Sequence, residues 1–352
     1  MTGPYLIYGA NGYTGELIAR EAARRGQRPV LAGRSTAAVR ALASELRLDH
    51  RAFALDDARA VDDGLKGMAV VLHCAGPFVR TFRPMADACL RARVHYLDVT
   101  GEIDVFEQLA ARDAEARAAG VMLLPGVGFD VAPSDCLAAH LKRRLPSATH
   151  LVLAFHSVGG LSRGTATTMI ENLHRGGLIR RNGALTPVPA AWKTRQVDFG
   201  RGPRRVVSIP WGDVSTAYHS TGIPDIEVYT TATSPLLLAM RASRLLRPLL
   251  ASSALQSFLK RRVRAGAPGP TAEQRVWGRT VLWGEVTDEA GGRAESRLHG
   301  PDGYTFTMLA ALAAVEKALS GSARAGFQTA SKAYGPDFVL GGFIEGVTRE
   351  DL

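Results

Sequence analysis

Short apolar runs alternate with segments of helix-forming residues through the first third of the chain. The apolar runs lie at residues 4–9, 29–33, 51–55, 68–75, 94–99 and 121–124. The run at 68–75 is nearly continuous, which is typical of a strand covered on both faces. The helix-forming segments lie between the first four runs, at 16–25, 37–46 and 57–66. This alternation predicts six strands with helical crossovers, a doubly wound parallel sheet of the Rossmann type.

The pattern changes in the second part of the chain. The segments 149–157 and 276–287 have the composition of strands. The second of these turns at the glycine-containing loop 289–292 into 293–299, which predicts a hairpin. A long strand pair after a parallel half predicts a separate α+β substrate domain.

These patterns divide the chain into an expected Rossmann domain at 1–145 and a substrate or oligomerisation domain at 146–325. A C-terminal segment follows at 326–352, with a return to the Rossmann domain as one option. The segment 304–319 predicts a helix with little charge, which is either buried or at a subunit interface. The subunit interface is slightly favoured, and we therefore expect a homo-oligomer, specifically a dimer.

Three glycines at a spacing of three, Gly9, Gly12 and Gly15, stand between the first strand and the first helix. Gly9 would allow a tight turn, Gly12 would let the main chain approach a pyrophosphate, and Gly15 would let the helix pack closely on the strand. Such turns also serve packing alone, but the strand-to-helix context favours a dinucleotide-binding turn. The intervening residues expected to contact the cofactor are Asn11, Tyr13 and Thr14.

The residues after the second strand predict which dinucleotide binds. NAD enzymes of this fold place a carboxylate there, on the ribose 2′-hydroxyl. This chain has Arg34 and Ser35 instead, and both can donate hydrogen bonds to a 2′-phosphate. We therefore expect NADPH or NADP, with an exposed surface arginine as the alternative interpretation.

The ends of the later strands are expected to line the ligand crevice, because ligands bind at the carboxyl ends of such sheets. Small and polar residues gather there, and Gly76 and Pro77 can bring bare main chain against the nicotinamide. The further cofactor-binding candidates are Ala75, Thr100 and Gly101. Cys74 is interpreted as a small buried apolar residue.

The sequence resembles the saccharopine dehydrogenase-like reductases, a family that includes saccharopine reductases and trans-acting enoyl reductases. The residues that carry the resemblance are 9–15, 31–35, 76–78, 96–102, 126–130 and 133–135, with weaker similarity at 163–166 and 326–329. It is specific over about the first 140 residues and looser beyond them. The resemblance implies an NADP(H)-binding Rossmann domain, a second domain with a curved mixed sheet, and hydride transfer involving a C=N or a conjugated C=C bond.

The proton donor is less well predicted than the cofactor site. The catalytic candidates are Tyr13, Asp98, Asp130, Tyr218 and His219, and weaker candidates are Glu102, His156 and Lys193. Each has a structural alternative, because polar residues in turns mostly bond to nearby backbone. Asp98 and Asp130 then cap loops, and His156 is a hydrogen-bonded histidine of a sheet.

Composition narrows the remaining function classes. The chain has 352 residues, 46% of them apolar, which suits two domains. Its three cysteines have no paired spacing, so we expect no disulfides, no metal and a cytoplasmic location without a signal peptide. The zinc-hydrolase pattern HExxH and the YxxxK pair of short-chain dehydrogenases are both missing.

The segment 235–264 is leucine-rich and basic, and no Asp or Glu occurs between residues 235 and 272. Its cations are Arg241, Arg244, Arg247, Lys260, Arg261, Arg262 and Arg264. Three interpretations stay open: an interfacial helix on anionic lipid, a docking face for an acidic acyl carrier protein, and a solvated helix face. Nucleic acid is not expected as a partner, because no nucleic-acid-binding module accompanies the charge.

The sequence is thus interpreted as an NADPH-dependent reductase of a conjugated C=C bond, acting on a small-molecule or acyl-chain substrate that a carrier can hold. One alternative is an imine reductase of the saccharopine kind, whose substrate carboxylates need cations. The arginines available for that role are Arg163, Arg175, Arg180, Arg181 and Arg195. The other alternative is a non-catalytic regulator that senses NADP(H).

Overall fold

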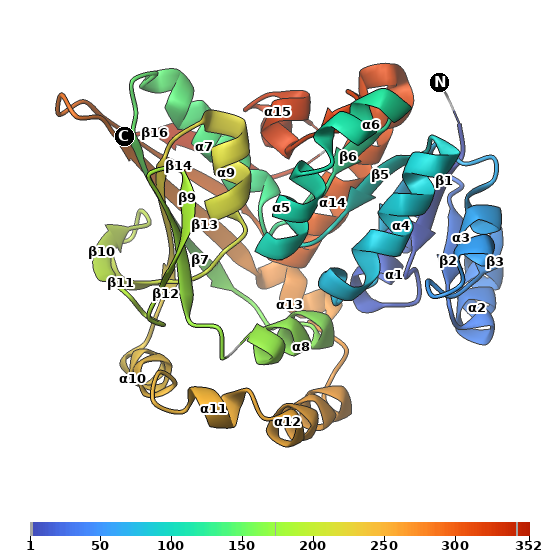
Figure 1. Ribbon diagram of the computed structural model, residues 1–352, viewed down its shortest axis with the longest axis horizontal. Coiled ribbons are helices and arrows are strands. Elements are labelled where there is room, and N and C mark those ends of the chain that lie inside the picture. The colour runs from blue at the N-terminus through green and yellow to red at the C-terminus, as the bar shows by residue number, and fades with distance from the viewer. Residues whose placement is uncertain (1–2, 173, 343) are drawn as a thin grey trace. The chain divides into compact units, whose positions relative to one another are not determined.

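The chain forms two compact units (Figure 1). The structure, a computed structural model, describes residues 3–172, 174–342 and 344–352. One unit consists of Met1–Ala132 with Tyr304–Ile344, and the other of Pro133–Gly303 with Glu345–Leu352. Each unit is built on one β-sheet.

The first unit contains a sheet of seven parallel strands in the order β15-β6-β5-β4-β1-β2-β3. The strands are β1 (Tyr5–Tyr8), β2 (Val30–Gly33), β3 (His50–Ala52), β4 (Val70–His73), β5 (His95–Asp98), β6 (Met122–Leu124) and β15 (Gly326–Phe327). Every residue of β1 and β4 is buried, as expected for strands covered on both faces. The predicted Rossmann-type sheet is confirmed, and β15 adds a seventh strand from the C-terminal segment.

Helices connect the strands of the first unit. They are α1 (Tyr13–Arg24), α2 (Thr36–Leu46), α3 (Ala58–Leu65), α4 (Phe78–Ala92), α5 (Ile103–Ala110), α6 (Asp113–Ala119), α14 (Gly303–Lys317) and α15 (Ala330–Tyr334), with a π-helical turn at Ala318–Ser322 and a 3-10 turn at Phe338–Leu340. Ser35 caps α2 and Asp57 caps α3, each through a side chain that accepts from a backbone amide in the first turn.

Helix α14 belongs to the first unit, which differs from the expected domain bounds. The amide of Phe129 donates to Thr307 Oγ1 at 2.9 Å, and the rings of Phe129 and Phe306 lie 6.0 Å apart. Phe306 and most of the apolar residues that follow it in α14 are buried. This burial accounts for the low charge of the helix. The second unit begins at Pro133, earlier than expected, and the C-terminal segment is shared between the two units.

The second unit is built on a nine-stranded mixed sheet, as predicted. Its strands are β7 (His150–Val158), β8 (Gly177–Arg181), β9 (Ala184–Val188), β10 (Thr194–Asp198), β11 (Pro203–Ser208), β12 (Asp225–Thr231), β13 (Arg279–Thr287), β14 (Arg293–Pro301) and β16 (Thr348–Asp351). The pair β12 and β7 is parallel and the other pairs are antiparallel. The predicted hairpin is confirmed, with Thr287 opposite Arg293.

The helices of the second unit are α7 (Ala132–Arg144), which begins at the unit boundary, α8 (Arg163–Asn172), α9 (Asp213–Thr221), α10 (Ser234–Ala242), α11 (Arg247–Leu250), α12 (Ser253–Ala265) and α13 (Ala272–Trp277). Val276 and Trp277 were expected in a strand, but they end α13. A capping box between Thr271 and Gln274 starts this short helix, and Gly278 ends it. Among the described residues, no helix is both long and apolar enough to cross a membrane.

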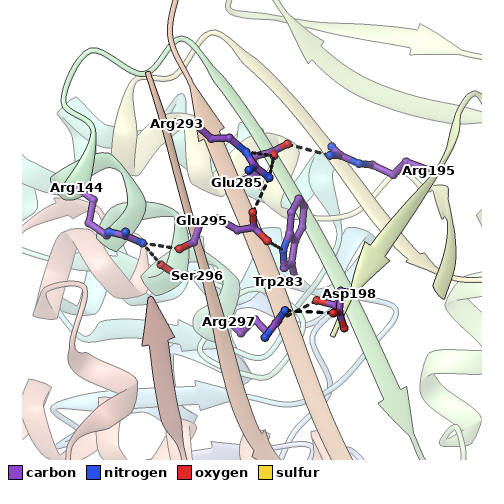
Figure 2. A network of polar contacts seen from close by, with 9 residues as sticks. All are labelled: Arg144, Arg195, Asp198, Trp283, Glu285, Arg293, Glu295, Ser296 and Arg297. Atoms are coloured by element: carbon purple, nitrogen blue, oxygen red, sulfur yellow. Dashed lines mark hydrogen bonds and ion pairs between the residues drawn. The ribbon is translucent and has the colours of Figure 1, made fainter. Parts of the chain in front are cut away.

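A polar network shows that the mixed sheet is curved (Figure 2). Arg195 of β10 pairs with Glu285 of β13 at 2.9 Å, and its guanidinium lies 5.1 Å from the ring centre of Trp283. Strands β11, β12 and β7 separate β10 from β13 in the sheet order. Because neighbouring strands lie about 4.8 Å apart, contacts this close require the sheet to curl back on itself.

Candidate functional site

The glycine turn between β1 and α1 has the backbone geometry that its sequence predicts. Gly9 has a φ of 81°, and its amide donates to Ala32 O at 2.8 Å. A Cβ on Gly15 would lie 2.3 Å from Gly9 O, so the helix approaches the turn more closely than any side chain allows. Gly12 is the N-cap of α1, and within the described residues no side chain caps this end. The first amides of α1 therefore face a space suited to an anion.

The residues after β2 lie beside this turn. A Cβ on Gly33 would lie 2.9 Å from Asn11 Oδ1, so the absence of a side chain there makes room for Asn11. Ser35 Oγ accepts from the amide of Ala38 at 3.4 Å and caps α2. Arg34 is exposed, and among the described residues no carboxylate pairs with it. Its guanidinium is thus available to a 2′-phosphate.

The loop after β4 approaches the glycine turn from the other side. A Cβ on Gly9 would lie 2.9 Å from the nitrogen of Ala75. Thr81 Oγ1 donates to Ala75 O at 2.6 Å, and His73 Nε2 lies 3.0 Å from the same hydroxyl. Because the hydroxyl proton goes to the carbonyl, His73 donates to Thr81. This chain of hydrogen bonds fixes the main chain ahead of Gly76 and Pro77.

His73 was not among the predicted site residues. Its ring is fully buried at the end of β4, and burial lowers its pKa to about 3, so the ring stays neutral. It lies in the run 68–75, whose pattern predicts only a strand covered on both faces. The sequence did contain an indication of this role, because His73 is a polar residue that ends a strand of otherwise apolar residues.

Glu102 holds the start of α4 and is not positioned as a free proton donor. Its two carboxylate oxygens accept the amides of Phe78 and Val79, each at 2.8 Å. A carboxylate at a helix N-terminus satisfies otherwise unpaired amides and complements the helix dipole. The structure therefore gives Glu102 a positioning role at the cofactor-side loop, in place of the weaker catalytic role considered for it.

Asp98 is also a positioning residue. It is fully buried and accepts from Tyr96 Oη at 2.7 Å and from the amides of Thr100 and Gly126 at 2.9 and 2.8 Å. Burial outweighs these hydrogen bonds and raises the pKa of Asp98 to about 7. The side chain joins the loops that follow β5 and β6, as expected for the loop-capping interpretation.

Asp130 lies in the loop after β6, close to the chain at Gly101. A Cβ on Gly101 would lie 2.8 Å from Asp130 Oδ2, so only glycine allows this approach. Burial, followed by the charge of Glu102, raises the pKa of Asp130 to about 6. A carboxyl group with a pKa near neutrality can exchange a proton at working pH, as a general acid or base must.

The other catalytic candidates fall into two groups. Tyr13 begins α1 in the first unit, and its ring packs edge-to-face on Tyr304 at 5.1 Å. Tyr218 and His219 lie in α9 of the second unit, where the Arg180 guanidinium stands 4.1 Å from the Tyr218 ring centre. Tyr13 shares the first unit with Asp98 and Asp130, whereas the structure describes Tyr218 and His219 as part of a separate unit.

The weaker candidates of the second unit have structural partners. His156 Nδ1 lies 3.1 Å from Thr231 Oγ1, which fits the interpretation of a hydrogen-bonded sheet histidine. Lys193 Nζ pairs with Glu227 at 2.5 Å. Within the described residues, no group of three or more His, Cys, Asp or Glu is placed to hold a metal ion.

A Glu102→Ala variant should lose stability. The amides of Phe78 and Val79 would lose their acceptors, which costs about 1–2 kcal/mol. Urea unfolding should show this loss, whereas Glu289→Ala, which removes an exposed carboxylate from the β13–β14 turn, should leave the unfolding free energy unchanged. Wild-type stability combined with abolished turnover in Glu102→Ala would instead assign Glu102 a chemical role.

Comparison with known proteins places the first unit in a known class. Residues 5–124 match the family profile described as the saccharopine dehydrogenase NADP binding domain. The Rossmann-type sheet with its glycine turn is therefore an NADP-binding domain. The resemblance to saccharopine dehydrogenase-like reductases is confirmed over this domain.

Relatives and a solved structure extend the comparison. Proteins named trans-acting enoyl reductase from Mycobacterium ulcerans and Mycobacterium tuberculosis are 34% identical to this chain over 187 residues. The match covers 47% of this chain and 43% of each relative, so the chain matches less than half of those proteins. Apo saccharopine dehydrogenase (L-Glu forming) from Saccharomyces cerevisiae matches with a TM-score of 0.65 at 12% identity, covering 99% of this chain and 100% of the yeast chain. That match establishes a shared fold.

Proposed function

We propose that this chain is an NADPH-dependent reductase that transfers hydride to the conjugated C=C bond of an enoyl substrate. The observation that carries the proposal is the NADP-binding domain at 5–124, together with 34% identity over 187 residues to proteins named trans-acting enoyl reductase. An acyl-chain substrate, held by a carrier or free, is the class that these names support. The three cysteines are free thiols, in keeping with a reducing cytoplasm.

The residues of the first unit fit the cofactor. The amides at the start of α1 would hold the pyrophosphate, and the uncapped N-terminus with three glycines leaves room for it. Arg34, which pairs with no described carboxylate, would hold the 2′-phosphate together with Ser35. When bound, NADPH supplies the hydride.

The loops after β4, β5 and β6 would orient the reacting groups. His73, Thr81 and Glu102 fix the main chain at Gly76 and Pro77, where the nicotinamide is expected. Asp98 holds the loops after β5 and β6 together. Asp130, with its pKa raised to about 6, is a first-unit carboxyl group that can exchange a proton at working pH.

The arginines of the second unit favour a C=C substrate over a saccharopine-like imine. A substrate with several carboxylates needs available cations. However, Arg180 donates to the carbonyls of Val214 and Gly183, and Arg195 pairs with Glu285. Arg163 likewise donates to a backbone carbonyl, that of Gly266. Three of the five arginines considered for this role are thus engaged within the protein.

The test is NADPH oxidation, followed by the loss of reduced-nicotinamide absorbance with two substrate panels. One panel contains 2-enoyl thioesters of rising chain length, and the other contains amino acids mixed with oxo acids or aldehydes. Turnover with the thioesters supports the proposal. Turnover only with the amine and carbonyl mixtures would replace it with an imine reductase, and NADPH binding without any turnover would favour the NADP(H)-sensing regulator.

A further inference from the structure

The segment from α10 to α13, residues 234–277 and here named the basic arm, exposes many large apolar side chains. In Figure 1 its first three helices follow one another as the gold and orange ribbon. Leu245 is 87% exposed, Trp277 80% and Leu238 70%. The other apolar side chains exposed along the arm are Leu236, Leu246, Leu249, Phe258 and Val276. So many exposed large apolar side chains within one segment indicate an interaction surface rather than an ordinary protein exterior.

The helices of the basic arm have few fully buried residues within the described part of the chain, although Leu255 and Leu259 of α12 are half-buried. Helices α12 and α13 have no buried residue, and α10 buries only Leu237. Isolated helices of this length are marginal in water, and most protein helices gain stability by burying an apolar face. The arm therefore carries apolar surface that a partner would cover.

The arm is tied to the second unit at specific points. Lys260 of α12 pairs with Glu171 of α8 at 2.6 Å, and Arg244 donates to the carbonyls of Ala190 and Ala191 at 2.8 and 2.9 Å. These contacts hold the arm in place while Leu245, Leu246 and Leu249 stay exposed. The basic arm is thus fixed to the second unit by specific polar contacts.

Apart from Glu273 at the start of α13, the charged residues of the arm are cationic. No acidic residue occurs between 235 and 272. Among the described residues, no carboxylate pairs with Arg241, Arg261 or Arg264, and all three are exposed. The partner must therefore supply negative charge along with an apolar phase.

These requirements discriminate between occupants. A second copy docked through the same face would set the arm's cations against each other, which is unfavourable. An acidic carrier protein would satisfy the charges, but the spread of exposed leucines and Trp277 also calls for an apolar phase. An anionic lipid surface supplies both, because leucine and tryptophan enter the headgroup boundary while arginines reach the phosphates. We propose that the basic arm binds the surface of membranes that contain anionic lipids.

Co-sedimentation with vesicles tests this proposal, without NADPH or substrate, so that its outcome is independent of the proposed function. The protein should bind vesicles of phosphatidylcholine with phosphatidylglycerol at least ~10-fold more tightly than phosphatidylcholine alone. Added salt should weaken the binding, because it screens the attraction between arginines and headgroups. Equal binding to both vesicle types, or to neither, would overturn the proposal.

Paired variants separate the two parts of the surface. Arg261→Glu with Arg264→Glu should lower binding to anionic vesicles at least ~10-fold. Leu245→Ser with Leu249→Ser should lower it by a similar factor at unchanged net charge. The control is Arg201→Glu with Arg205→Glu, which makes the same charge change at exposed positions elsewhere in the second unit and should keep near wild-type binding.

Two results would contradict the lipid assignment. A leucine variant that still binds anionic vesicles like wild type would show charge attraction without insertion, as at an acidic protein partner. A leucine variant that changes the sedimentation coefficient of the protein alone, with wild-type protein failing to bind vesicles, would show that the arm covers a second copy. The substituted arginines and leucines are all exposed, so the unfolding curves of the variants should match that of wild type.

Discussion

A Gly12→Val variant should lose NADPH affinity by ~100-fold or more and keep its fold. Gly12 is the N-cap of α1 with φ −84° and ψ 161°, an extended conformation that valine adopts readily. A Cβ there would meet only Gly9 O, at 3.3 Å, which a small shift relieves. The rest of the side chain would stand at the helix end, where the pyrophosphate would lie. Losing the hydrogen bonds between the helix end and the pyrophosphate costs about 3 kcal/mol of binding free energy, which corresponds to the ~100-fold loss of affinity.

Titration of NADPH by its fluorescence, together with thermal unfolding, measures both parts of this prediction. Gly341→Val is the matched control, because Gly341 lies in the same unit, is exposed and extended, and has its nearest Cβ contact at 3.6 Å. It should bind NADPH like wild type. Gly15→Ala should instead destabilise the fold, since its Cβ would overlap Gly9 O. Wild-type affinity in Gly12→Val would remove the pyrophosphate from the glycine turn.

The sequence was most informative where burial is decided locally. The strands β1 and β4 are short apolar runs buried on both faces, so their pattern alone identifies them. The strand β15 has two residues, Gly326 and Phe327, which is too short for any periodicity. Helix α13 has a sequence pattern typical of a helix start, the capping box of Thr271 and Gln274. However, it ends in Val276 and Trp277, a β-branched and an aromatic residue, which are typical of strands.

Contacts between distant segments explain what the sequence could not predict. The low charge of α14 indicated burial, but only its contact with Phe129, 178 residues earlier, identifies the unit that covers it. Glu102 follows a strand end, where a carboxylate can face either a substrate or a backbone. It contacts α4 because β4 and β5 are neighbours in the sheet, a fact of topology that local pattern does not contain.

The same limit applies to the proton donor. Sequence reasoning could place Asp98, Glu102 and Asp130 at strand ends but could not rank them. The structure gives partners for two of them: three donors hold Asp98 and two amides hold Glu102. Asp130 lies in the loop beside Gly101, with a pKa raised to about 6. Their hydrogen-bond partners, rather than their residue type, show that Asp98 and Glu102 hold the backbone in place.

An Arg34→Asp variant should reverse the cofactor preference, changing the NADPH-to-NADH affinity ratio by ~100-fold or more. The variant loses a charge-assisted hydrogen bond and sets a carboxylate against the 2′-phosphate, which weakens NADPH binding. The same carboxylate can accept from the ribose 2′-hydroxyl, as the acidic residue of NAD enzymes does at this position. Because no described carboxylate pairs with Arg34, the substitution breaks no ion pair within the protein, and stability should stay close to wild type.

Competition titrations of the two reduced cofactors measure the ratio directly. Arg59→Asp on α3 is the control, because it makes the same charge change at an exposed arginine of the same unit and should leave the ratio unchanged. A conservative Arg34→Lys variant should keep the preference for NADPH while weakening it, since lysine retains the charge but not the planar donor pair. If Arg34→Asp and Arg59→Asp lowered NADPH affinity equally, with no gain for NADH, Arg34 would act only through the overall charge of the protein. The 2′-phosphate would then be held by other residues, and the sequence signal after β2 would have to be interpreted as a surface arginine.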